Sequence, residues 1–526
     1  MKKQKITSVI LIALAGLAFL SGCKIVNSAH SDNINSEVVS QELPLPAFTP
    51  DAENMFTNRD KKTEYSDYTE IILSDNGSSA DSASVVIDGN IITIVSSGTY
   101  VLRGSLSNGQ IIINTGKDEK VHLVLRGVDI NCDNSAAIYV KQADKVFITL
   151  ETATINTLSN KNAFEAIDSN NIDAVVFSKE DITFNGSGKL IINAVYGHGV
   201  VSKDDLVVIS GDYEITSAGH GLEGKDSVRI AGGNFIIKSG KDGIHADNIE
   251  DMFGFIYVTG GDFDITAGTD GFDASASLQI EGGTFEISSG DDGIHADTKV
   301  IISGGEITIL KSYEGIEGKS IDIAGGIISI VASDDGLNAA SGNDGSGFGG
   351  RPGAGGFAAD ADCYIKISGG QIIINSSGDG IDSNGNVYVT GGETYVSGST
   401  RSADGALDYD GSAAITGGIF VAVGSRGMAQ NFGTSSTQGS MLVNLSSGQN
   451  ANTCVSLVDE AGDIIILYEP PKAYDSIVIS SPAIKQAGVY TLNAGLSSVK
   501  ITMQSLIYSS GSNIGGQPGR PQDGRR

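Results

Sequence analysis

The chain has 526 residues and a formal net charge of −29, from 34 basic and 63 acidic side chains. Nucleic-acid binding needs a basic face, so this balance argues against nucleic acid as a partner. The 70 glycines against 9 prolines favour many tight turns over a helical fold, and Trp is absent.

Residues 1–22 have the pattern of a secretion signal, with three lysines before an apolar run that starts at Ile6. The run is too short for a comfortable membrane span, and it ends in the Leu-Ser-Gly-Cys of 20–23, which resembles a bacterial lipobox. That resemblance implies cleavage before Cys23 and a lipid on its sulfur. We therefore expect a membrane partner through the N-terminal lipid anchor, on the extracellular face of the cell. Ordinary secretion with an incidental cysteine is the alternative.

Composition and patterning divide the rest of the chain. Residues 23–64 are polar and predicted to form a disordered tether, and 509–526 a disordered tail. Between them, 65–427 show strand patterns, which are irregular over 65–190 and regular over 191–427. Residues 428–508 lose the period, and their strands predict a small antiparallel β module. It either caps the preceding coils or stands as a separate sandwich.

Over the regular part, one phrase returns about every 22 residues: an acidic or His residue, a Gly, an apolar residue and a polar one. Apolar positions alternate within each period, as in strands, and three strands with three turns leave no room for helices. Gly-Gly pairs such as Gly232-Gly233 mark turns that need a left-handed backbone. We therefore predict an all-β, right-handed parallel β-helix, expected to be a monomer. The aromatic residues at 213, 235, 263 and 285 share one strand phase and are predicted to stack in its core.

Two periods are longer than the others. Extra residues fall near 248–253, and a longer Gly-rich insertion falls at 341–360. The second insertion is predicted to be a loop, because it lacks alternating aliphatic residues; a degenerate coil is the alternative.

The polar positions of the phrase form rows when the coils are stacked. The residues before the repeated Gly are His198, His220, Asp242, Asp270, Asp292, Glu314, Asp335, Asp379 and Asp404. The residues two positions after it are Val201, Glu223, His245, Asp273, His295, Glu317, Asn338, Asp382 and Leu407. A third row, four positions after it, includes Lys225, Asp247, Asp297 and Lys319. Coils about 4.8 Å apart place these residues in neighbouring columns on one flank.

Like charges at that spacing repel by roughly 1–4 kcal/mol per pair, so the column needs compensation. Lysines in the third row compensate the first coils and the coil of Glu314 and Glu317, whereas no Lys is in phase from Asp242 to Asp297. Oxygen-rich clusters suit Ca²⁺, although His245 and His295 also suit a transition metal. The residues predicted to hold Ca²⁺ are Asp242, Asp247, Asp270, Asp273, Asp292, Asp297, Glu314 and Glu317. Those predicted to contact a further ligand are Lys225, His245, His295 and Lys319. Simple Asp-Gly turn chemistry, with Asp capping its own backbone, is the alternative for any single position.

Several phrases resemble the clostridial cell-surface proteins known as carbohydrate-binding domain-containing proteins. They include Ser97–Gly104, Ser135–Val140 and Val200–Leu206, together with the coil phrases Asp242–Asp247 and Asp292–Asp297. The resemblance covers about residues 65–505. It implies a pectate-lyase-like right-handed β-helix with bound calcium, and affinity for polygalacturonate and cellulose. This sequence departs from the family at His198 and His220, where family members generally carry Asp.

The leading hypothesis is non-catalytic, calcium-dependent binding of an acidic polysaccharide, because an acidic protein holds a polyuronate through a bridging cation. With no Trp, stacking on crystalline cellulose is the weaker half of the expectation. A calcium-dependent polysaccharide lyase is the rival, with Lys225 or Lys319 as base. A surface spacer without a specific glycan is the third possibility.

Overall fold

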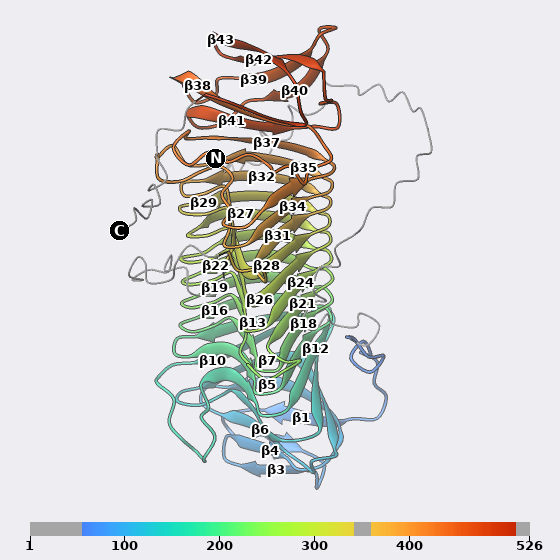
Figure 1. Cartoon of the computed structure of the whole chain (residues 1–526). Helices are drawn as coiled ribbons and strands as arrows, with labels where there is room; N and C mark the ends of the chain where they lie inside the picture. Colours follow the sequence, from blue (N-terminus) through green and yellow to red (C-terminus); the bar gives the residue numbers. More distant parts are fainter. Residues whose placement is uncertain (1–54, 341–358, 512–526) are drawn as a thin grey trace, which may run out of the picture. The chain divides into compact units, whose positions relative to one another are not determined.

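The computed structural model describes residues 55–340 and 359–511. Within these ranges the chain forms strands, turns and loops and contains no helix. The described residues therefore include no helix long and apolar enough to cross a membrane. Strands of successive coils lie above one another in parallel (Figure 1). The predicted fold class is confirmed as an all-β parallel solenoid of about 13 turns with a small antiparallel sheet at its C-terminus.

Each regular coil gives one strand to each of three sheets, and four long strands continue round a corner into a second sheet. The first sheet contains β1 (Thr69–Leu73), β5 (Gly98–Leu106), β7 (Lys120–Cys132), β9 (Lys145–Leu150), β12 (Asp181–Gly186), β15 (Asp205–Val208), β18 (Ser227–Ile230), β21 (Phe255–Val258), β24 (Ser277–Ile280), β26 (Ile294–Ile302), β28 (Ile316–Ile323), β31 (Tyr364–Ile367), β34 (Asn386–Val389) and β36 (Ala413–Ile415). The second contains the ends of β5 and β7, then β10 (Ile155–Asn160), β13 (Lys189–Ala194), β16 (Asp212–Ser217), β19 (Asn234–Ser239), β22 (Asp262–Ala267), β25 (Thr284–Ser288), β27 (Glu306–Ser312), β29 (Ile327–Ala332), β32 (Gln371–Ser376), β35 (Glu393–Ser397) and β37 (Ile419–Gly424). The third contains β4 (Ile91–Ile94), β6 (Gln110–Asn114), β8 (Ile138–Gln142), β11 (Ala174–Ser178), β14 (His198–Ser202), β17 (Leu222–Gly224), β20 (Ile244–Ala246), β23 (Phe272–Ala274), the starts of β26 and β28, β30 (Leu337–Ala339) and β33 (Ile381–Ser383).

Antiparallel strands occur at both ends of the stack. At the first coils, β2 (Ser79–Ala80) pairs with β1, and β3 (Val85–Asp88) pairs with β4. At the last coil, β41 (Tyr474–Ser480) pairs antiparallel with β37 and β38 (Ser440–Gln449), whereas β44 (Ile507–Ser510) pairs in parallel with β38. A separate four-stranded sheet holds β39 (Val455–Asp459), β40 (Ile464–Tyr468), β42 (Val489–Ala494) and β43 (Ser497–Thr502). Because β41 completes the hydrogen bonds of β37, the C-terminal module covers an edge of the last coil.

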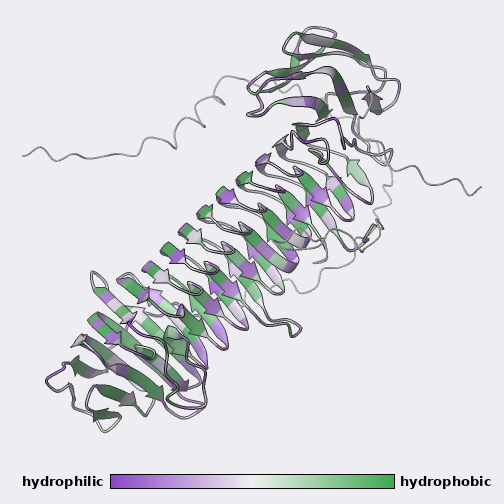
Figure 2. Cartoon of the chain, turned by 90° about the vertical axis from the view of Figure 1, so that its left-hand side faces the viewer, coloured by the Kyte–Doolittle hydropathy of each residue, from purple (hydrophilic) through white to green (hydrophobic). Residues whose placement is uncertain are grey.

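Hydrophobic and hydrophilic residues alternate along many strands of the coils, as in the sequence (Figure 2), and the apolar residues of successive coils form one buried core. The predicted aromatic row is confirmed as part of it. The ring of Phe263 stacks on those of Phe235 and Phe285 at centroid distances of 4.7 Å, and Tyr213 stacks on Phe235 at 5.0 Å. These rings are buried, so the row stabilises the coil and offers no surface to a sugar.

Glycines serve two different purposes in each coil. The second Gly of the Gly-Gly pairs has a positive φ, for example 124° at Gly233, as the sequence predicts. The repeated Gly that follows the acidic residue allows close approach instead. A Cβ at Gly271 would lie 2.5 Å from the carbonyl oxygen of Gly293 in the next coil. The repeated phrase therefore keeps Gly because successive backbones come too close there for a side chain.

The two insertions and the two chain ends lie only partly within the described residues. The extra residues near 248–253 form a loop between β20 and β21. The insertion at 341–360 falls outside the described residues except for its last two, as do the predicted signal peptide, Cys23 and the tail beyond 511. Residues 55–64 of the expected tether are described, and they contact the first sheet. Asp60 is 1 % exposed, accepts a hydrogen bond from Thr183 (2.8 Å) and pairs with Lys145 (3.0 Å). Residues 55–64 therefore pack against the coils.

Candidate functional site

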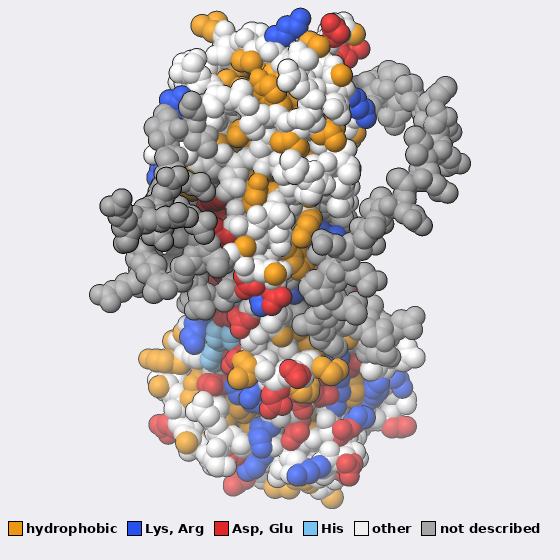
Figure 3. Space-filling view, in the orientation of Figure 1, with side chains coloured by type: hydrophobic (Ala, Val, Ile, Leu, Met, Phe, Trp, Pro, Cys, Tyr) orange, Lys and Arg blue, Asp and Glu red, His pale blue; other side chains and the backbone are white. Residues whose placement is uncertain are grey.

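From β17 to β33, the third sheet presents one polar side chain per coil on its outer face. In β20, Ile244 and Ala246 are buried in the core, so His245 between them faces outward. Backbone pairing aligns these central residues coil by coil, in the order Glu223, His245, Asp273, His295, Glu317, Asn338 and Asp382. The row expected from the sequence thus exists as a ladder in direct register. Figure 3 shows histidine and acidic side chains gathered on this flank.

The row before the repeated Gly lies beside this ladder and is tied to the backbone. One oxygen of Asp270 accepts the backbone N–H of Asp292 in the next coil, at 2.7 Å. The same bond joins Asp242 to Asp270 (3.1 Å) and Asp335 to Asp379 (2.5 Å). Each of these acids therefore caps the following coil rather than its own turn, and its second oxygen is left for the ladder. We call the two rows together the polar column.

Side chains of the polar column meet in five groups of three, whose ligand atoms lie within 4.8 Å of one another. The groups are His198/His220/Glu223, His220/Asp242/His245, Asp270/Asp273/His295, Asp292/Glu314/Glu317 and Asp335/Asp379/Asp382. The column thus changes along its length, from imidazole-rich groups near β14 and β17 to groups that contain only carboxylates at β28 and β33.

Histidines balance the carboxylates in the middle coils. His245 Nδ1 lies 3.1 Å from Asp242 and 2.9 Å from Asp273, and His295 Nδ1 lies 2.8 Å from Asp273. Burial lowers the pKa of both imidazoles, but the carboxylates outweigh it and raise the pKa to about 10 for His245 and about 9 for His295. No lysine is in phase with these coils, and histidines compensate the carboxylates instead. The histidines therefore compensate Asp242 and Asp273, whereas burial and the charges of these two acids raise the pKa of Asp270 to about 8.

Acid–acid repulsion is strongest further along the column. Burial and the charges of Asp379 and Asp382 raise the pKa of Asp335 to about 10. Burial and the charges of Asp382 and Asp408 raise the pKa of Asp379 to about 9. Burial together with Glu317 and Glu314 raises the pKa of Asp292 well above its usual range. The charged neighbours that cause these shifts are other carboxylates, so these coils are the ones that a bound cation would stabilise most.

The remaining predicted residues lie in the third row and differ in their contacts. Asp247 and Asp297 are exposed and stand outside the five groups, although Asp297 lies 3.8 Å from His295 Nε2. Lys225 is also exposed. Lys319 pairs with Asp362 at 3.1 Å, and that contact raises the pKa of Lys319.

An open hollow of about 370 Å³ lies beside the carboxylate end of the column. Its lining includes four residues predicted from the sequence, namely His295, Asp297, Glu317 and Lys319. Since Glu317 also belongs to the group with Asp292 and Glu314, the hollow gives a ligand access to a carboxylate group. The predicted ligand-binding and metal-binding residues therefore meet at this coil.

The group of Asp335, Asp379 and Asp382 was missing from the predicted metal-binding set. Asp335 and Asp379 are 44 residues apart because an insertion lies between them, so the sequence does not show that they occupy adjacent coils. Both residues stand directly before the repeated Gly, and this shared position could have placed them in the same row. His220, in a row noted from the sequence, was likewise left out of that set, although it contacts Asp242 at 2.8 Å.

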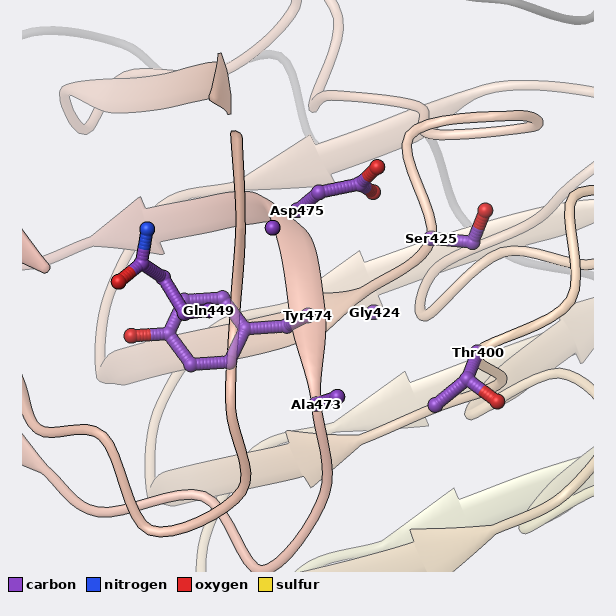
Figure 4. Close-up of a pocket in the computed structure, with 8 residues that line it drawn as sticks. Thr400, Gly424, Ser425, Gln449, Ala473, Tyr474 and Asp475 are labelled. Atoms are coloured by element: carbon purple, nitrogen blue, oxygen red, sulfur yellow. The ribbon is translucent and has the colours of Figure 1, made fainter. Parts of the chain in front are cut away.

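A second hollow lies where the last coil meets the C-terminal module, lined by Thr400, Gln449, Tyr474 and Asp475 among others (Figure 4). Asp475 pairs with the guanidinium of Arg426 at 3.2 Å and also accepts its backbone N–H. The one acid of this hollow is thus already engaged, so it offers no comparable cation site.

Comparisons with known proteins agree with the resemblance. Residues 88–336 match the model of the family described as carbohydrate-binding domain-containing protein. A protein of that name from Acetivibrio thermocellus is 35 % identical over 126 residues, which are 24 % of this chain and 44 % of that relative. This chain thus spans less than half the length of that relative.

A solved structure, the polysaccharide lyase-like protein from C. thermocellum as a gadolinium derivative, is 29 % identical. The match covers 52 % of this chain and 98 % of that one, with a TM-score of 0.38. The resemblance seen in the sequence is confirmed over residues 88–336, which match the carbohydrate-binding domain-containing protein family.

Proposed function

We propose that the protein binds an acidic polysaccharide of the polygalacturonate type at the cell surface without cleaving it, through Ca²⁺ held by the polar column. The observation that carries this proposal is the carboxylate group of Asp292, Glu314 and Glu317 beside an open hollow. Carboxylate oxygens are the ligands that Ca²⁺ prefers. The family match over residues 88–336 supports a carbohydrate as the partner.

Charge explains why a cation is part of the proposal. The chain carries a net charge of −29, so a polyuronate approaching the column meets repulsion. A calcium ion with protein carboxylates on one side and uronate carboxylates on the other converts that repulsion into a bridge. The Lys319 ammonium, on the rim of the same hollow, supplies a second positive contact.

Lys319 also favours binding over cleavage. A lyase needs a base that is unprotonated near neutral pH to remove the proton beside the uronate carboxylate. The contact with Asp362 raises the pKa of Lys319, which keeps its ammonium protonated. The side chain is thus suited to hold an anion and poorly suited to act as a base.

The test is retention on immobilised polygalacturonate, with Ca²⁺ or with a chelator, together with absorbance of unsaturated uronate in solution. We expect calcium-dependent retention, no rise in absorbance, and loss of retention in Glu317→Gln. Glu286→Gln is the matched control, because Glu286 is an exposed acid on the second sheet. A rise in absorbance would establish a lyase instead. Absence of retention would favour a structural spacer and overturn the proposal.

A further inference from the structure

The imidazole-rich end of the polar column has a different chemistry from the carboxylate end. We propose that His220, Asp242 and His245 bind a late first-row transition-metal ion of the Zn²⁺ class. This site is independent of the proposed calcium function, because it shares no ligand with the groups at β28 and β33.

Ligand atoms from two coils converge on one carboxylate oxygen. Nδ1 of His220 lies 2.8 Å from Asp242 Oδ2, and Nδ1 of His245 lies 3.1 Å from the same oxygen. Ligands about 2.0–2.1 Å from a common Zn²⁺ stand about 2.9–3.4 Å from one another at angles between 90° and 110°. The nitrogen–oxygen distances are thus close to those around a shared ion.

The two imidazole nitrogens have unmet bonding capacity. Nδ1 of His220 and Nδ1 of His245 are buried and form no well-aligned hydrogen bond among the described residues. Asp242 lies close to both nitrogens, and Asp273 lies 2.9 Å from Nδ1 of His245. His220 is only 7 % exposed, so bulk water does not readily satisfy it. A buried nitrogen in this state destabilises the fold, and a bond to a metal ion at the same place would satisfy it.

The carboxylate is held in position to bind such an ion. Asp242 Oδ1 accepts hydrogen bonds from the hydroxyl of Thr269 and from the backbone N–H of Asp270. These donors occupy one oxygen and direct Oδ2 toward the imidazoles. Outer contacts of this kind orient metal-binding carboxylates in known sites.

Two nitrogens and one oxygen select the class of metal. Imidazole suits Zn²⁺, Ni²⁺, Co²⁺ and Cu²⁺, whereas Ca²⁺ takes oxygen ligands. The rings of His220 and His245 are stacked at 4.2 Å with an interplanar angle of 9°. Since parallel rings point their lone pairs side by side, we expect both rings to turn about their Cβ–Cγ bonds when the ion binds.

The test uses the full chain without an added histidine tag, freed of metal by chelation and titrated with Zn²⁺ in a calorimeter. Co²⁺ serves as a second probe, because coordinated Co²⁺ gives visible absorption bands. We expect tight Zn²⁺ binding by the wild type and its loss, with loss of the Co²⁺ bands, in His220→Asn. Thr269→Val removes only the orienting hydroxyl and is expected to weaken Zn²⁺ binding about 10- to 100-fold.

Asp335→Asn is the matched control and should bind Zn²⁺ like the wild type, because Asp335 belongs to another group. The proposal is overturned if the wild type binds no Zn²⁺, or if folded His220→Asn binds it unchanged. If His220→Asn does not fold, Thr269→Val with wild-type affinity overturns it instead. Calcium-dependent retention on polygalacturonate should survive in Thr269→Val, which separates this site from the proposed function.

Discussion

Replacing Asp335 by Asn should change stability in opposite directions with and without calcium. Without a cation, the folded protein keeps the Asp335 carboxyl protonated, since its pKa is about 10, whereas the unfolded chain ionises it near 3.8. At pH 7.5 this difference costs the folded state up to about 5 kcal/mol. Asn removes that cost and keeps a side-chain oxygen able to accept the N–H of Asp379. In chelator, Asp335→Asn should therefore be more stable than the wild type.

With saturating Ca²⁺, the wild type should instead be more stable than Asp335→Asn. The ion stabilises the ionised carboxylates of Asp335 and Asp379, and the variant offers it one ligand charge fewer. Calcium should thus raise the free energy of unfolding of the wild type by several kcal/mol and that of the variant by much less.

The pH dependence follows the same reasoning. A carboxyl whose folded pKa is raised contributes most to stability below its unfolded pKa, and this contribution is lost as pH rises from about 4 to about 10. In chelator, Asp335 alone should lower wild-type stability by about 1.4 kcal/mol per pH unit between pH 5.5 and 7.5. The slope should diminish in Asp335→Asn and in the calcium-loaded wild type.

Urea unfolding followed by circular dichroism, at both pH values and with Ca²⁺ or chelator, measures these effects. The matched control is Asp264→Asn, since Asp264 is an exposed acid on the second sheet, and it should show no inversion. If Asp335→Asn shifts stability in the same direction under both conditions, or Ca²⁺ leaves the wild type unchanged, then the column does not hold calcium at this coil.

Three further results are expected. Lys319→Ala should weaken calcium-dependent retention on polygalacturonate without changing calcium affinity, measured by affinity electrophoresis and calorimetry; equal retention would remove Lys319 from the binding surface. Burial and nearby cations lower the pKa of His122 to about 4, so this group should cost about 3 kcal/mol of stability as pH falls from 6.5 to 4. Urea unfolding of His122→Gln should lack that component, and an unchanged acid profile would contradict it. Phe263→Ala, in the middle of the aromatic stack, should cost about 3–5 kcal/mol in urea unfolding and leave glycan retention intact at low temperature. Loss of retention in the folded variant would show that the stack takes part in binding.

Much of the architecture could be predicted because a solenoid repeats local rules. The 22-residue period, the alternation of apolar residues and the Gly-Gly pairs each describe one coil, and stacking copies places equivalent residues above one another. The core position of Phe263 and the ladder from Glu223 to Glu317 could be predicted from the position of each residue within the period. The predicted acids Asp292, Glu314 and Glu317 form one group for the same reason.

Other features depend on contacts between coils that the position of a residue within the period does not reveal. The position at 271 needs Gly because the backbone of Gly293 in the next coil lies against it, a contact that the sequence does not show. The 44-residue separation of Asp335 and Asp379 concealed that they lie in adjacent coils.

The sequence by itself determined a parallel β-solenoid with a polar column on one flank, because strand alternation and a constant period leave little freedom in how coils stack. Only the tertiary structure decided how the column's charges are balanced. Side-chain distances show His245 and His295 between the middle acids, whereas Asp335 and Asp379 face mainly other carboxylates. Charge compensation depends on distances of a few ångströms and on burial, and neither can be read from spacing along the chain.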